Sequence, residues 1–150
     1  MREYATQMEA ARKGIITPEM KIVAKKEYRT EEEIREWVAK GQVAICANRL
    51  HTCIDPNGVG SMLRTKINVN LGVSRDCKDY DVEMKKVQAA VDMGAEAIMD
   101  LSSHGNTQPF RRKLTSECTA MIGTVPVYDS VIHYQRDLAT LTAKDFIDVV

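Results

Sequence analysis

The chain has 150 residues, enough for one ordinary domain, and its 21 basic and 21 acidic residues cancel. This balanced charge gives no electrostatic reason to expect nucleic acid or an anionic membrane as a partner. No apolar run approaches the roughly 20 residues that span a bilayer, and the N-terminus lacks the apolar core of a signal peptide. We therefore expect a cytoplasmic protein.

The four cysteines are scattered and form no C-x-x-C pair. This spacing indicates neither a zinc ribbon nor a redox dithiol, and in a chain without a signal peptide it favours reduced, structural thiols. They are Cys46, Cys53, Cys77 and Cys118.

The first part of the chain has the start and stop signals of short helices. Thr6–Glu9 and Thr30–Glu33 both have the pattern of a capping box, in which the threonine and glutamate each satisfy a backbone N–H. Thr17 is expected to be an N-cap, with Pro18 at the first helical position. We predict a helical N-terminal segment over residues 1–42.

A short buried strand is predicted at Val43–Ala47, and a loop rich in turn formers at Thr52–Met62 is long enough to cover a site. Between them, Asn48 and His51 follow a strand end, so both are candidates for a supporting role at a binding site. His51 has the titration range of a proton shuttle, but it can equally serve as a capping or packing residue.

Three segments have the pattern of strands that end in polar residues, and helices separate them. The first helix starts at about Asp79 and stops at Gly94, and the second carries Phe110. This alternation predicts an α/β fold with a parallel sheet. The three predicted strands are Lys66–Gly72, Ala95–Ser102 and Ala120–Tyr128.

In the first of these strands, Val69 and Leu71 alternate with Asn68 and Asn70. A buried polar group needs a partner, so this pattern indicates that the polar face meets a ligand or a polar barrel interior.

Three side chains recur at equal intervals along these units: Asn70, Met99 and Tyr128. The interval is about one strand–helix unit, so the three side chains are expected at one end of one sheet, where such folds bind ligands. Asn70 offers an amide that both donates and accepts, and Tyr128 offers a ring and a hydroxyl. The alternatives are an amide paired with a neighbouring strand and, for Met99, an ordinary core methionine.

Four further features lie near these strand ends. Asp100 on a buried strand needs a cationic or N–H partner, and Lys66 is a candidate for an internal ion pair. Lys66, Asp100 and the polar strand end Ser102 are also candidates for a supporting role at the site. Gly72–Ser74 precedes a helix and could cradle an anion. The basic cluster Phe110–Lys113 is interpreted as a solvated helix face.

No metal site is predicted, because His104 and His133 each stand alone, without a second ligand at useful spacing. Residues 131–141 are expected to be irregular. The last helix presents Phe146 and Ile147 and stops without a C-cap, and so few strands cannot close a barrel. We therefore expect the fold to continue beyond residue 150.

Several pieces of the chain resemble the phosphomethylpyrimidine synthase (ThiC-like) family of radical S-adenosylmethionine (SAM) enzymes. They occur in the family's order across nearly the whole chain. The pieces are Thr6-Gln-Met, Gly14-Ile-Ile-Thr-Pro-Glu-Met20, Ala47-Asn48-x-x-His51, Lys66-Ile-Asn-x-Asn-x-Gly72, Met99-Asp-Leu-Ser102 and Gly123-Thr-Val-Pro-x-Tyr128.

This resemblance implies that residues 43–150 are the first part of a (β/α)8 barrel. It also implies a lyase whose substrate is aminoimidazole ribotide, and it carries the family's substrate contacts onto Asn70, Met99 and Tyr128. A [4Fe-4S] cluster with SAM supplies a 5′-deoxyadenosyl radical in the family, and two later histidines hold a divalent metal such as zinc. The family's C-x-x-C-x-x-x-x-C cluster motif is not in these residues. A homodimer, or assembly with the remainder of the barrel, is expected.

Departures from the family's pattern concern the reaction product. Asn68-Val-Asn-Leu-Gly72, Leu101-Ser-Ser-His-Gly105 and Cys46-Ala-Asn48 stand where pyrimidine synthases usually read Asn-Ala-Asn-Ile-Gly, Leu-Ser-Thr-Gly and Pro-Ala-Asn. The pattern is more similar to 5-hydroxybenzimidazole synthase, a paralogue in cobalamin biosynthesis that uses the same ribotide. The alternatives are the pyrimidine synthase of thiamine biosynthesis and a non-catalytic module that binds the ribotide or pairs with another subunit.

Overall fold

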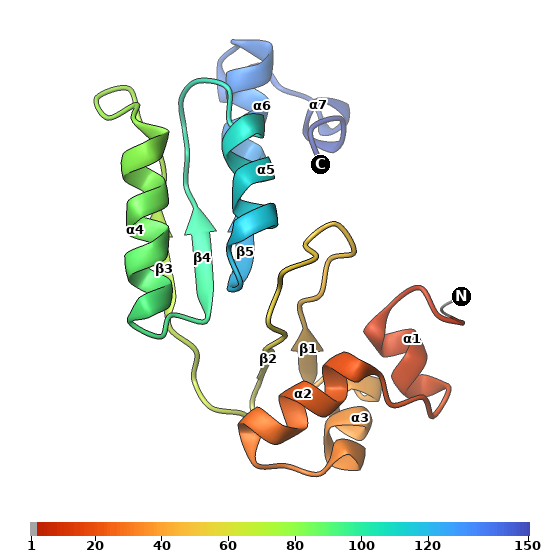
Figure 1. Cartoon of the computed structure of the whole chain (residues 1–150). Coiled ribbons are helices and arrows are strands. Elements are labelled where there is room, and N and C mark those ends of the chain that lie inside the picture. The colour runs from red at the N-terminus through yellow and green to blue at the C-terminus, as the bar shows by residue number, and fades with distance from the viewer. Residues whose placement is uncertain (1–2) are drawn as a thin grey trace. The chain divides into compact units, whose positions relative to one another are not determined.

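The computed structural model describes residues 3–150. Its internal contacts divide the chain into two compact units, Met1–Lys66 and Ile67–Val150. Figure 1 shows the helices and strands of both units. The mixed α/β architecture predicted from the sequence is confirmed, whereas the (β/α)8 barrel stays a prediction because the larger sheet has three strands.

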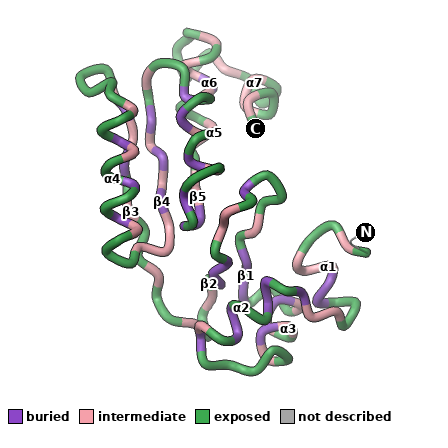
Figure 2. The backbone as a smooth tube through the Cα atoms, in the orientation of Figure 1, coloured by how far each residue is buried: buried purple, intermediate pink, exposed green. Residues whose placement is uncertain are grey.

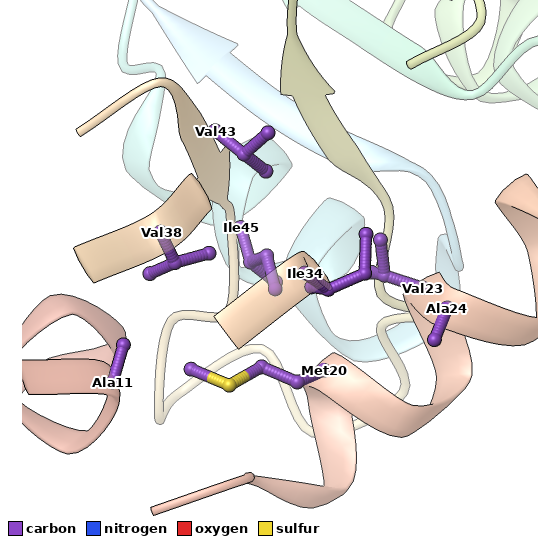
Figure 3. Close-up of a cluster of buried hydrophobic side chains, with 8 residues drawn as sticks. All are labelled: Ala11, Met20, Val23, Ala24, Ile34, Val38, Val43 and Ile45. Atoms are coloured by element: carbon purple, nitrogen blue, oxygen red, sulfur yellow. The ribbon is translucent and has the colours of Figure 1, made fainter. Parts of the chain in front are cut away.

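The first unit combines three helices with a small antiparallel sheet. Its elements are α1 (Gln7–Arg12), α2 (Pro18–Glu27), α3 (Glu31–Ala39), β1 (Val43–Ile45) and β2 (Gly58–Gly60). The helices and β1 enclose an apolar cluster that includes Met20, Ile34 and Val38, all nearly or fully buried (Figure 3). The sequence places the domain division after residue 42, but β1 pairs with β2 and packs on this cluster, so it belongs to the first unit.

Threonines cap the helices of the first unit largely as predicted. The Thr17 hydroxyl accepts a hydrogen bond from the Met20 N–H at 3.1 Å. The Thr30 capping box is complete, since Glu33 accepts from the Thr30 N–H at 2.8 Å while Thr30 caps Glu33. At α1 only half of the predicted box forms, because the Glu9 carboxylate accepts from the N–H of the residue before Thr6.

The second unit is a three-stranded parallel sheet with helices after each strand. The strands pair in chain order, β3 with β4 and β4 with β5 (Figure 1). Because both pairs are parallel, each needs a crossover connection, and here that connection contains a helix. Its elements are β3 (Asn68–Leu71), α4 (Tyr80–Asp92), β4 (Ala97–Asp100), α5 (Gln108–Glu117), β5 (Met121–Thr124), α6 (Pro126–Tyr134), the 3₁₀ helix η1 (Leu138–Thr140) and α7 (Ala143–Ile147).

The two connecting helices, α4 and α5, pack on the same face of this sheet. Ile98 from β4 is fully buried at the centre of that face, and Val87 from α4 and Leu114 from α5 cover it. Figure 2 shows the buried stripes along these elements. On the opposite face Met121 is buried, and the other residues are exposed or half-buried: Asn68, Asn70, Ala97, Met99 and Gly123.

Two sequence predictions for the end of this unit are wrong. The predicted strand Ala120–Tyr128 ends at Thr124, and α6 begins at Pro126. A proline at the first helical position has its φ fixed near the helical value and lacks only an N–H that would be unsatisfied anyway, so it starts a helix rather than extending a strand. Residues 131–134, predicted to be irregular, continue this helix.

Among the described residues, 3–150, no helix is both long and apolar enough to cross a membrane.

Gly72 follows β3 and allows the backbone there to pass very close to the end of β4. Its φ is +136°, and a Cβ built there would lie 2.5 Å from the Ser102 backbone nitrogen and 3.0 Å from an Asp100 carboxylate oxygen. Both the backbone conformation and the lack of space therefore require glycine.

We expect Gly72→Ala to lower the free energy of unfolding by about 3 kcal/mol or more, because backbone strain and a steric clash act together. Gly94→Ala is the matched control: its φ is +88°, but a Cβ there meets nothing within 4 Å. Strain alone should cost that variant about 1–2 kcal/mol. Urea unfolding of both variants measures the difference, and equal losses would contradict the close approach at Gly72.

Candidate functional site

Asn70 and Met99 lie side by side near the carboxyl ends of β3 and β4. The two are register partners in the parallel pair, so their side chains share the face that α4 and α5 leave open. The Asn68 amide donates to the Asn70 amide oxygen at 3.1 Å, so the two amides of β3 satisfy each other in part. The predicted alternation of polar and apolar faces on this strand is confirmed.

Gly123 makes room for the Met99 side chain. It is the register partner of Met99 on β5, and a Cβ there would lie 2.7 Å from the Met99 Cε and 2.8 Å from its sulfur. The thioether therefore lies across the glycine, still on the open face of the sheet. A larger residue at position 123 would displace it.

Tyr128 lies in the first turn of α6, not on a strand as predicted. Because α6 begins two residues after β5 ends, Tyr128 stays at the carboxyl end of the sheet, as Asn70 and Met99 do. Its side chain is exposed, at 42%. The sequence thus predicted the correct end of the sheet for Tyr128 but the wrong secondary structure.

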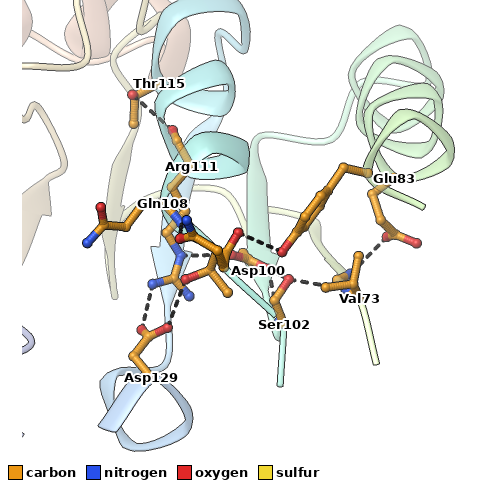
Figure 4. A network of polar contacts seen from close by, with 12 residues as sticks. Val73, Glu83, Asp100, Ser102, Gln108, Arg111, Thr115 and Asp129 are labelled. Atoms are coloured by element: carbon orange, nitrogen blue, oxygen red, sulfur yellow. Dashed lines mark hydrogen bonds and ion pairs between the residues drawn. The ribbon is translucent and has the colours of Figure 1, made fainter. Parts of the chain in front are cut away.

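A buried polar network holds the strand ends beneath these residues (Figure 4). Asp100 is fully buried, and one of its carboxylate oxygens accepts from the Ser102 N–H at 2.9 Å and from the Ser102 hydroxyl at 2.5 Å. The Ser102 hydroxyl oxygen in turn accepts from the Val73 N–H at 3.1 Å. This chain of bonds joins the turn after β4 to the turn after β3.

The second carboxylate oxygen of Asp100 binds Arg111 of α5. The Arg111 Nε donates to it at 2.9 Å, and the Arg111 Nη1 donates to an Asp129 oxygen at 2.5 Å. Burial acts to lower the pKa of Arg111, but the hydrogen bonds that Arg111 donates to Asp129 and Asp100 outweigh it, and the pKa is raised. Thr107 donates to the other Asp129 oxygen at 3.2 Å.

The sequence interpretation of this region therefore needs two corrections. Asp100 does form an internal ion pair, but with Arg111 instead of Lys66. Lys66 precedes the amino end of β3, whereas Asp100 stands at the carboxyl end of β4, so in a parallel sheet the two belong to opposite ends. Arg111 was interpreted as part of a solvated face, yet its side chain is 22% exposed and pairs with two carboxylates.

Lys66 instead pairs with Glu27 of α2, within the first unit. Both side chains are buried, at 5% and 1% exposure, and Glu27 also accepts from the Arg64 N–H at 2.8 Å. Burial acts to raise the pKa of the Glu27 carboxyl, but the hydrogen bonds from Lys66 and Arg64 outweigh it and the pKa is lowered. Lys66 therefore has a structural partner, and the role predicted for it at a binding site stays a prediction.

Asn48 and His51 lie in a turn of the first unit. The Asn48 side-chain oxygen accepts from the Leu50 N–H at 2.9 Å, and the Asn48 carbonyl accepts from the His51 N–H at 3.1 Å. His51 is nearly buried. These contacts fit the capping and packing alternative, and a supporting role at the strand ends stays a prediction for both residues.

The segment Gly72–Ser74 is not an anion cradle. Its three N–H groups already donate to Glu83 at 2.9 Å, to Ser102 at 3.1 Å and to the Cys77 carbonyl at 2.8 Å. Glu83 is a fully buried carboxylate that takes the place an anion would need. The segment is thus fixed by the protein's own acceptors.

A cleft of about 810 Å³ opens next to this network, in the second unit. Residues 103–108, which follow β4, line one side, and Arg111 and Asp129 also contribute. His133 and other residues of α6 line it as well. Asn70, Met99 and Tyr128 are not among its lining residues, so the cleft and the three predicted residues are separate features of the same sheet end.

The described residues do not fit an iron–sulfur cluster. The four cysteines form no disulfide with one another and lie two in each unit, and within residues 3–150 no group of three or more His, Cys, Asp or Glu side chains is arranged to hold a metal ion. A [4Fe-4S] cluster needs several converging thiolates. The expected zinc likewise finds no ligand set in this part of the chain.

Residues 6–150 match the model of the Radical SAM ThiC family. This chain belongs to that family. Relatives include a phosphomethylpyrimidine synthase of Alkaliphilus oremlandii (strain OhILAs), 60% identical over 148 residues, which are 99% of this chain and 34% of that protein. A phosphomethylpyrimidine synthase of Clostridium botulinum (strain Hall) is 55% identical over 146 residues, which are 97% of this chain and 33% of that protein. The chain thus spans about a third of the length of the curated relatives it matches.

Membership of this family implies radical SAM chemistry, with a [4Fe-4S] cluster and SAM, in the full-length enzymes.

Sequence reasoning missed three residues of this site: Arg111, Asp129 and Glu83. For Arg111 a signal existed, because the helix after β4 starts at the carboxyl end of that strand and so carries its first basic residue toward Asp100. For Glu83 the only sign was an acidic residue in the first turn of α4, which is equally typical of exposed helix starts.

The Glu27 carboxylate gives a pH dependence to the first unit. Because its folded pKa is lowered, its stabilisation is present above the unfolded pKa of about 4.3 and is lost as the pH falls through the folded value. Glu27→Gln should therefore unfold more easily than the unmodified chain at pH 7, and the difference should shrink below about pH 4.

Thermal unfolding of both proteins between pH 7 and pH 3 measures this difference. Glu31→Gln is the control, since the Glu31 carboxylate is half exposed and lies 3.9 Å from Lys21. A Glu27→Gln difference that is constant with pH would contradict the role of this ion pair.

Proposed function

We propose that this chain is the N-terminal third of an enzyme that converts aminoimidazole ribotide into the pyrimidine phosphate of thiamine biosynthesis. The relatives that it matches over nearly its whole length are named phosphomethylpyrimidine synthase. This supports the pyrimidine branch better than the hydroxybenzimidazole branch, which the departures in sequence had favoured. A cytoplasmic location and a homodimer, or assembly with the remainder of a barrel, are parts of the same proposal.

The observation that carries the proposal is the pairing of Asn70 with Met99 on an open sheet face. The Asn70 amide and the Met99 thioether are in register on neighbouring strands, so a ligand there would meet a polar group and a polarisable apolar group side by side. Tyr128 at the same end of the sheet adds a phenol that can stack on a ring or donate to a phosphate. This combination suits a ligand with a small heteroaromatic ring and a ribose phosphate.

The arrangement of the sheet also supports a barrel. Strands β3, β4 and β5 are adjacent in chain order, and both connecting helices cover one face. In a (β/α)8 barrel all helices lie outside and the inner faces of the strands meet one another, with ligands bound at the carboxyl ends. Asn70 and Met99 would then face the interior near its mouth.

Within this proposal, the role of the chain's own residues is to bind and orient the ribotide. Holding a substrate in one geometry raises the reaction rate, because the substrate loses its translational and rotational freedom on binding and not during the reaction. This holds for radical reactions as for others. Neighbouring strands that are hydrogen-bonded along their length provide such a rigid frame.

A second candidate is the hydroxybenzimidazole reaction on the same ribotide. The departures that favour it include Val69 and Leu71 in β3, His104 after β4, and Cys46. His104 lines the 810 Å³ cleft, close to the network of Asp100 and Arg111, so a change of residue there can affect what the sheet end accommodates.

Product analysis separates the two reactions. The whole protein that carries this chain is incubated anaerobically with aminoimidazole ribotide, SAM and a reductant, and the products are identified by mass spectrometry and fluorescence. We expect a pyrimidine phosphate. A product with benzimidazole fluorescence would reject the pyrimidine proposal and support the second candidate.

Asn70→Ala should raise the Kd for aminoimidazole ribotide about tenfold, because one hydrogen bond to the ligand is lost. Gln88→Ala is the matched control, since Gln88 is an exposed amide on α4 whose partner is Asp92. Calorimetric titration of the whole protein gives both values. An unchanged Kd for Asn70→Ala would count against the binding role of this sheet face.

A further inference from the structure

We infer that Arg111 is a positioning residue for ribotide binding: it fixes the helix start that carries Tyr128 to the strand end that carries Met99. The inference rests on the proposed function. Among the described residues, the side-chain partners of Arg111 are Asp100 and Asp129, and not Asn70, Met99 or Tyr128.

The geometry of Arg111 is that of a bridge between two elements. Its Nε donates to Asp100 at 2.9 Å and its Nη1 donates to Asp129 at 2.5 Å. Asp100 directly follows Met99 on β4, and Asp129 directly follows Tyr128 on α6. One guanidinium thus holds the immediate neighbours of two predicted ligand contacts (Figure 4).

The two carboxylates need this bridge for different reasons. Asp100 is fully buried, and its other oxygen is committed to Ser102, so Arg111 is the cation that balances its charge. Burying a carboxylate without such a partner is strongly unfavourable. Asp129 is less buried, and its bond to Arg111 is what extends the rigid strand end to α6.

Tyr128 depends on this bond because it has little packing of its own. Its side chain is 42% exposed, and α6 has no side-chain cap at its N-terminus. The contacts of Asp129 with Arg111 and Thr107 therefore fix the first turn of α6. Asn70 lies on β3, whose end is joined to Asp100 through Ser102 and Val73 and not to Asp129, so its position should not respond when only the bond between Arg111 and Asp129 is lost.

A guanidinium is required because the bridge uses two nitrogens in a planar fork. A lysine ammonium is a point charge on a flexible side chain and does not reproduce the hydrogen bonds to Asp100 and Asp129 at the same time. Arg111→Lys keeps the positive charge beside Asp100 and so should fold, while the link to Asp129 weakens. Arg111→Met removes both the charge and the link.

The test is a set of double-mutant cycles on aminoimidazole ribotide binding, measured by calorimetry on the whole protein that carries this chain. Arg111→Lys should raise the Kd about tenfold, because Tyr128 is no longer held in place and about one contact with the ligand is lost. Its effect should be much smaller in a Tyr128→Ala background, and should be unchanged within about twofold in an Asn70→Ala background. Equal effects in both backgrounds would overturn the inference, because a loss of general stability does not distinguish Tyr128 from Asn70.

Arg112→Met is the matched control on the same helix, since Arg112 is exposed and forms no ion pair among those of the described residues. Its Kd should stay within about twofold of the unmodified value. If Arg111→Lys does not fold, Asp129→Asn replaces it, because that variant weakens the same link without exposing Asp100. An unchanged Kd in Asp129→Asn would likewise overturn the inference.

The outcomes also separate this inference from the proposed function. If neither Asn70→Ala nor Tyr128→Ala alters ribotide binding, the proposed function fails. If both variants weaken binding while Arg111→Lys does not, the function stands and the positioning role of Arg111 is rejected.

Discussion

The buried carboxylate of Asp100 is the constraint on which the sheet end of the second unit depends. A carboxylate without solvent must be matched by donors and by a positive charge, and here Ser102 and Arg111 supply them. To do so, the turn after β4 must fold back on the strand, and α5 must place its first turn beside that strand end. The turn after β3 joins the same arrangement through the Val73 N–H, and Gly72 allows the close approach. One acidic residue thus fixes the ends of two strands and the start of a helix.

This rigid end carries the residues for which the family resemblance implies substrate contact. Asn70 and Met99 are side by side on the open face, on strands whose other face is closed by an apolar core around Ile98. Alternation along each strand separates the two faces: apolar residues on one face provide stability, and the opposite face is the one that we propose for the ligand. Tyr128 is the proposed contact that this sheet does not fix directly, and for this reason we propose a positioning role for the link through Asp129 and Arg111.

The sequence predicted the parts of this account that depend on local patterns. Alternation located β3, threonine signals located the helix starts, and equal spacing located three residues at one sheet end. The sequence did not predict which charges meet, because ion pairs such as Asp100–Arg111 and Glu27–Lys66 depend on which strand and helix ends are adjacent in space. The helix at Tyr128 was missed because the apolar residues on both sides of Pro126 were interpreted as one continuous strand. Pro126 is instead a helix-start signal. The choice between a pyrimidine and a hydroxybenzimidazole product depends on contacts between side chains and the ligand. A pattern of residues along the sequence does not give those contacts.

The most direct measurement of the central claim is NMR of the whole protein that carries this chain, labelled with ¹³C at the methionine methyl groups. Met99 should report ligand binding, because its methyl group lies at the open face over Gly123, whereas Met20 is fully buried in the core of the first unit. On addition of aminoimidazole ribotide, we expect the Met99 methyl signal to shift and the Met20 signal to stay unchanged. A Met99 signal that does not move at saturating ribotide would contradict the account.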